Sequence, residues 1–166
     1  TNDVAALRAL SFFGPFAGFE AWMEVAALSR NALETTIDRL SALSLMDVLG
    51  GEECYALHPL TRNFVRNELL ADLGIARQTG MRFAKYWVNY AKRYGGEIEN
   101  YKACDLLERE WPNIDAAADW LWQATVVRDL EVADKETARM LGDLASTLAE
   151  FLFFSGHWDE QVQLSA

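Results

Sequence analysis

Histidine is the side chain best suited to proton transfer or phosphate contact near neutral pH, and the chain has two, His58 and His157. They lie far apart in the sequence, and neither has an adjacent Asp or Cys at metal-ligand spacing, so no metal site is predicted. His157 is expected in an interhelical turn formed by Gly156-His157-Trp158. His58 precedes Pro59 at an expected strand-to-helix junction, where a side chain either projects from the domain's rim or serves only as a hydrogen-bonded structural histidine.

The remaining reactive side chains do not form a recognisable catalytic set. Cys54 and Cys104 have neither a CxxC pattern nor a Cys/His cluster, so neither a zinc site nor a disulfide framework is predicted and a reducing cytoplasm is expected. The sequence has no GxSxG motif and no GxxxxGK[ST] phosphate-binding loop. Two pairs of carboxylates are interpreted as solvated helix faces: Glu108 with Glu110, and Asp115 with Asp119. We therefore assign no catalytic residue and expect that this chain alone is not an enzyme.

The charge is acidic overall and unevenly placed along the 166 residues, which carry a formal net charge of −10. Residues 75–102 are net basic, through Arg77, Arg82, Lys85, Lys92, Arg93 and Lys102, whereas the segments on either side are acidic. Such a chain is a poor candidate for binding nucleic acid, because that affinity comes largely from neutralising phosphates. Glu150 interrupts the most apolar stretch, so no membrane span is expected. The sequence starts at Thr1 rather than Met, and we expect a piece of a longer protein.

The elements that position His58 belong to a predicted N-terminal unit, residues 1–74. Apolar spacing predicts helices over 3–12, 19–28 and 32–44, the last begun by an Asn31–Glu34 capping box. Apolar runs at 45–49 and 55–57 flank Gly50-Gly51-Glu52-Glu53 and predict a β-hairpin. Another helix should begin at Pro59. The third and fourth helices are expected to turn these residues inward: Leu33, Ile37, Leu40, Leu43, Leu60, Phe64, Val65, Leu69 and Leu70. This order predicts a winged-helix unit.

A second unit, residues 75–166, is predicted to be entirely helical and repeat-like. Phe83, Trp87, Tyr90 and Tyr94 recur at helical spacing and are interpreted as core rather than as a base-stacking surface. Helices are expected over 101–110 and 114–122, separated by Trp111-Pro112-Asn113, and over 136–154 and 158–164. Helix pairs with short turns suggest an α-solenoid. The predicted fold class is therefore mainly α, with one β-hairpin.

A winged helix raises the question of DNA, because its third helix can enter a major groove. Here the net charge of that helix and its cap is zero, because Arg30 and Arg39 are offset by Glu34 and Asp38. The wing carries Glu52 and Glu53 where phosphates would lie. The charges disfavour DNA binding.

The order of several short motifs resembles the winged-helix domain of NB-ARC and related STAND signalling ATPases, particularly bacterial members. The motifs are Leu10-Ser11-Phe12-Phe13-Gly14-Pro15-Phe16, Phe19-Glu20-Ala21, Leu40 to Leu45, and Tyr55-Ala56-Leu57-His58-Pro59-Leu60-Thr61-Arg62. Further on, residues 110–117 with Trp120 are similar to a motif of the family's helical region, and Gly156-His157-Trp158-Asp159-Glu160 is similar to a tetratricopeptide-type turn.

The resemblance implies a regulatory role in a cytoplasmic nucleotide switch. His58 matches the family's histidine that touches the β-phosphate of ADP, although Pro59 stands where plant and animal members have aspartate. An upstream module would bind ADP or ATP with Mg²⁺, the winged helix would help to hold the ADP-bound closed state, and helical repeats would sense a protein or small ligand. The chain itself would hold no cofactor and contact no membrane. The alternatives are a DNA-binding winged-helix regulator and a helical scaffold that binds a peptide.

Overall fold

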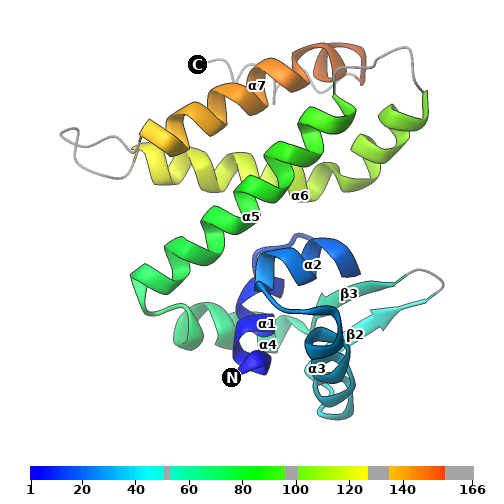
Figure 1. Cartoon of the computed structure of the whole chain (residues 1–166), viewed down its shortest axis with the longest axis vertical. Coiled ribbons are helices and arrows are strands. Elements are labelled where there is room, and N and C mark those ends of the chain that lie inside the picture. The colour runs from blue at the N-terminus through cyan, green and yellow to red at the C-terminus, as the bar shows by residue number, and fades with distance from the viewer. Residues whose placement is uncertain (51–52, 96–100, 127–134, 156–166) are drawn as a thin grey trace. The chain divides into compact units, whose positions relative to one another are not determined.

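The computed structural model describes the backbone of residues 1–50, 53–95, 101–126 and 135–155. These residues are mainly helical with one β-hairpin, which confirms the predicted fold class (Figure 1). The chain divides into two compact units, 1–86 and 87–166. The division falls inside α5 (Leu73–Tyr94), whereas the sequence placed it at residue 74, where this helix has just begun.

Three helices form the first part of the N-terminal unit: α1 (Asn2–Leu10), α2 (Phe19–Ala26) and α3 (Arg30–Ala42). Trp22 of α2 is completely buried, and its indole Nε1 donates a hydrogen bond of 2.9 Å to the Ala6 carbonyl of α1. The predicted capping box is wrong, because the N-cap of α3 is Ser29, whose Oγ accepts from the Ala32 amide. Ser29 has the extended backbone that an N-cap needs, and Asn31 already lies within the helix.

The predicted hairpin is present as β2 (Met46–Leu49) and β3 (Cys54–Leu57), which pair antiparallel (Figure 1). A further strand, β1 (Ala17–Gly18), pairs with the other edge of β3, so the order is β1-β3-β2. Two residues are too few to show a periodic pattern, and the sequence therefore did not reveal β1. β3 is the central strand and leads directly to His58.

The fourth predicted helix begins at Pro59 as expected but is short: α4 (Pro59–Phe64) passes into η1 (Val65–Leu69), a π-helical turn. The predicted burial of Leu60 and Phe64 is wrong, since they are 74% and 56% exposed. They lie four positions apart and share a face of α4, whereas Val65 on the next position is buried. Leu43 is also exposed, because it ends α3 as its C-cap rather than continuing the apolar face.

The second unit contains the end of α5 with α6 (Tyr101–Val126) and α7 (Lys135–Ser155). The predicted break at Pro112 is wrong, because α6 continues through it. A proline removes one helical hydrogen bond, and here Trp111 and Ile114 on either side are buried, so packing retains the helix. Of the aromatic residues expected in the core along α5, Phe83 and Trp87 are buried, and Tyr90 and Tyr94 are half-buried.

A close approach joins α5 to α7 inside the second unit. A Cβ added to Gly95 would lie 2.8 Å from the Ala91 carbonyl and 2.9 Å from Cγ2 of Thr147. Gly95 is therefore required by packing. The expected turn at residues 156–158 with His157, the helix at 158–164 and the wing residue Glu52 lie outside the described residues.

Candidate functional site

His58 is exposed at the point where β3 ends and α4 begins. It is the N-cap of α4, and its Nδ1 accepts a hydrogen bond of 3.4 Å from the Leu60 amide. Because Nδ1 acts as an acceptor, the neutral imidazole carries its proton on Nε2. His58 thus presents an N–H donor at the rim of the unit, while Leu57, immediately before it, is buried and anchors the strand.

Arg62 is the neighbour that the structure brings to this junction, and sequence reasoning did not select it as a site residue. Its backbone amide donates to the His58 carbonyl at 2.9 Å, so the two residues are one helical turn apart. Its guanidinium donates to the backbone carbonyls of Ser11, Phe13 and Gly14, with distances of 3.3 Å for Ser11 and 3.0 Å for Gly14. The available signal was an arginine in the last turn of a short helix, but sequence cannot identify main-chain acceptors this distant.

The two arginines that the DNA interpretation would require are both in ion pairs. Arg30 pairs with Glu20 of α2 and with Glu34 of α3, the latter at 3.8 Å. Arg39 donates to the Asp3 carboxylate through Nη2 at 2.6 Å and Nε at 3.1 Å. The basic side chains of α3 are therefore occupied by carboxylates of the same unit.

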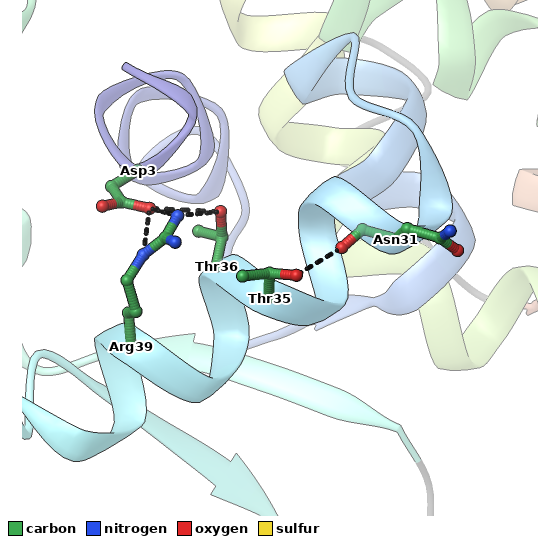
Figure 2. Close-up of polar contacts among 5 residues, drawn as sticks. All are labelled: Asp3, Asn31, Thr35, Thr36 and Arg39. Atoms are coloured by element: carbon green, nitrogen blue, oxygen red, sulfur yellow. Dashed lines mark hydrogen bonds and ion pairs between the residues drawn. The ribbon is translucent and has the colours of Figure 1, made fainter.

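Asp3, Thr36 and Arg39 form a polar cluster between α1 and α3 (Figure 2). The buried Thr36 hydroxyl donates to Asp3 Oδ1 at 3.1 Å, and Arg39 donates to the same oxygen. The hydrogen bond from Arg39 is the main cause that lowers the pKa of Asp3 below its usual 3.8, while desolvation opposes it. Asn31, in the same view, accepts from Thr35 through its main-chain oxygen, in keeping with its place inside α3.

The basic segment 75–102 does not present a uniform cationic surface. In the first unit, Arg82 donates to the Val25 carbonyl at 2.7 Å, and its burial lowers its pKa. In the second unit, Lys92 forms an ion pair of 2.7 Å with Asp143.

The interpretation of Glu110 as a solvated residue is wrong. It is buried in α6 and accepts hydrogen bonds from Asn113 at 3.1 Å and Arg109 at 3.2 Å. Asp119 is exposed, and Asp115 is half-buried.

Cys54 lies in β3 and Cys104 in α6, and neither is joined in a disulfide. Among the described residues, no group of three or more His, Cys, Asp or Glu side chains is arranged to hold a metal ion. Within the same residues, none of the helices has the length and apolar character needed to cross a membrane.

Comparison with known proteins gives no relative on which to base a function. No protein-family model matches the chain, and neither the curated proteins nor the solved structures contain a match.

Proposed function

We propose that this chain is the regulatory part of a cytoplasmic NB-ARC or STAND-type nucleotide switch, in which the N-terminal unit helps to hold an ADP-bound closed state. The observation that carries the proposal is the orientation of His58. Its Nδ1 is engaged by the Leu60 amide, so its Nε2–H is the donor left for a ligand. Oxygens of a phosphate are the acceptors that suit such a donor, and a hydrogen bond to a charged acceptor is stronger than a neutral one.

The placement of His58 on the rim explains how nucleotide and conformation would be coupled. A contact from an exposed side chain forms only when another surface approaches it, and His58 is exposed in the isolated unit. If ADP occupies a separate module of the longer protein, the bond to its β-phosphate exists only in the docked state. A ligand that gains a contact in one state shifts the population toward that state. ADP would thereby favour closure, and the helical second unit would link closure to the sensing of a ligand or partner.

The ion pairs of α3 favour this role over DNA binding. Both arginines of that helix are matched by carboxylates, and Glu53 lies exposed on the described part of the wing. To contact these arginines, the phosphates of a DNA duplex would have to displace the carboxylates, and at the wing they would approach the negative charge of Glu53.

Two substitutions separate the donor of His58 from its capping function. His58→Asn keeps a good N-cap but removes the outward N–H, whereas His58→Gln restores an amide donor near the Nε2 position and weakens the cap. In the longer protein we expect His58→Asn to accelerate ADP release about 10- to 100-fold, the loss of one hydrogen bond to a charged group. His58→Gln should release ADP more slowly than His58→Asn.

Release is measured by displacement of a fluorescent ADP analogue from the purified longer protein. An unchanged rate in His58→Asn would refute the phosphate contact. The reading frame that encodes the chain supplies an earlier test, because the proposal requires a GxxxxGK[ST] loop upstream within the roughly 200 to 300 residues of an ATPase core. A start codon immediately before Thr1 would contradict it.

A further inference from the structure

The helix that carries His58 is not held in place by its own apolar side chains. None of the residues of α4 is buried, and its two large apolar residues, Leu60 and Phe64, face solvent. The first buried residue after His58 is Val65, at the start of η1, and it is η1 that packs against α1. Hydrophobic burial, the usual means of fixing a short helix, is therefore lacking along α4.

Arg62 supplies the attachment instead. Its Nη1 donates to the Ser11 and Phe13 carbonyls and its Nη2 to the Gly14 carbonyl, so one guanidinium spans the turn that follows α1. Arg66 adds a single bond of 3.3 Å from Nη2 to the Ser11 carbonyl. Ser11 is the C-cap of α1, and the partial negative charge at the end of a helix favours a cation there. The planar fork of arginine can reach several such acceptors at once, which a lysine ammonium does less well.

The environment of Arg62 indicates that this attachment is energetically significant. The side chain is half-buried, and desolvation together with the nearby charge of Arg66 lowers its pKa. A guanidinium withdrawn from water in this way depends on its hydrogen bonds, because breaking them leaves its own N–H donors unsatisfied.

We propose that Arg62 is the positioning residue for His58, with its three-carbonyl contact holding α4 so that Nδ1 stays on the Leu60 amide and Nε2–H points outward. The link is direct, because the Arg62 amide donates to the His58 carbonyl one turn away. The contact of the outward Nε2–H with ADP rests on the proposed function, whereas the positioning of His58 by Arg62 concerns this chain alone.

The test uses Arg62→Met in the 166-residue chain, with Arg66→Met as the matched control that loses one bond instead of three. Nitrogen-15 NMR of the imidazole reports the tautomer directly, and the His58 signals are assigned by their absence from His58→Asn. We expect Arg62→Met to change the Nε2–H form to a mixture of tautomers. Amide hydrogen exchange at residues 60–65 should accelerate about tenfold or more, with α2 and α3 unchanged, and Arg66→Met should change it by less than about threefold.

A folded Arg62→Met with wild-type imidazole signals and wild-type exchange would overturn the proposal. If that variant does not fold, Arg62→Lys retains the charge but not the fork, and exchange at residues 60–65 should still rise by about threefold or more. No rise in Arg62→Lys would equally overturn it. ADP release in the longer protein separates the two claims: if both Arg62→Met and His58→Asn leave it unchanged while the imidazole signals shift, the nucleotide role fails and the positioning role stands.

Discussion

The cluster of Asp3, Thr36 and Arg39 should contribute to the unfolding free energy through an ion pair and through a hydrogen bond. Two substitutions of Asp3 measure these contributions separately. Asp3→Asn keeps an oxygen that accepts from Thr36 but removes the charge opposite Arg39, whereas Asp3→Ala removes both. The carboxylate is about one-third exposed, so loss of its ion pair should cost no more than about 0.2–1 kcal/mol. Asp3→Ala also deprives the buried Thr36 hydroxyl of its acceptor, and we expect a total of about 1–2 kcal/mol.

The pH dependence of this effect has a definite sign. The pKa of Asp3 is lowered in the folded state, so the folded protein binds its proton less readily than the unfolded chain does. The resulting stability is present above the unfolded value, near 3.8, and is lost as the pH falls through the lowered folded value. The difference in unfolding free energy between wild type and Asp3→Asn should therefore be constant at neutral pH and shrink below about pH 4.

The assay is urea unfolding at several pH values, followed by amide hydrogen exchange in α1 and α3 so that the first unit is observed by itself. Asp38→Asn is the control, because Asp38 is exposed on α3, next to Arg39, and forms no ion pair within the described residues. A wild-type minus Asp3→Asn difference that stays constant from pH 7 to below the folded pKa would refute the assigned role of the charge. Asp3→Ala with wild-type stability would refute the cluster itself.

Three further substitutions test the packing of the two units. Gly95→Ala should lower the unfolding free energy of the second unit by about 1–3 kcal/mol, since its Cβ would meet Ala91 and Thr147 at under 3 Å. Gly142→Ala, in α7 with nothing within 4 Å of the added Cβ, should instead stabilise by about 0.5–1 kcal/mol, and equal effects of the two in urea unfolding would contradict the close approach. Trp22→Phe should cost the first unit about 1–3 kcal/mol through loss of the buried bond to Ala6, measured by the exchange of α2 amides, and unchanged protection would show that this bond does not contribute.

The N-terminal unit was largely predictable because its signals are local. Apolar spacing located α1, α2 and α3, two short apolar runs on either side of a glycine pair located the hairpin, and Pro59 marked the first turn of α4. The junction that carries His58 was therefore predicted correctly. The helix break predicted at Pro112 was wrong, since the burial of neighbours such as Trp111 and Ile114 can offset the amount by which proline weakens a helix.

The attachment of α4 was beyond sequence reasoning for a different reason. Periodicity assigned Leu60 and Phe64 to the core, but it could not anticipate the π-helical turn that follows α4. The acceptors of Arg62 are main-chain carbonyls about fifty residues away. Because every residue has a backbone carbonyl, the sequence does not show which one accepts a hydrogen bond. The N-cap of α3 was predicted at Asn31, two residues after the observed N-cap Ser29. Both are good capping residues, and only backbone geometry distinguishes them.

Phosphorus-31 NMR of ADP bound to the longer protein tests the proposed contact between Nε2–H of His58 and the β-phosphate of ADP. We expect His58→Asn to shift the β-phosphorus resonance of bound ADP and to leave the α-phosphorus resonance in place, and we expect His58→Gln to shift the β-phosphorus resonance less. Identical β-phosphorus resonances in wild type and His58→Asn, with ADP bound to both, would contradict this contact.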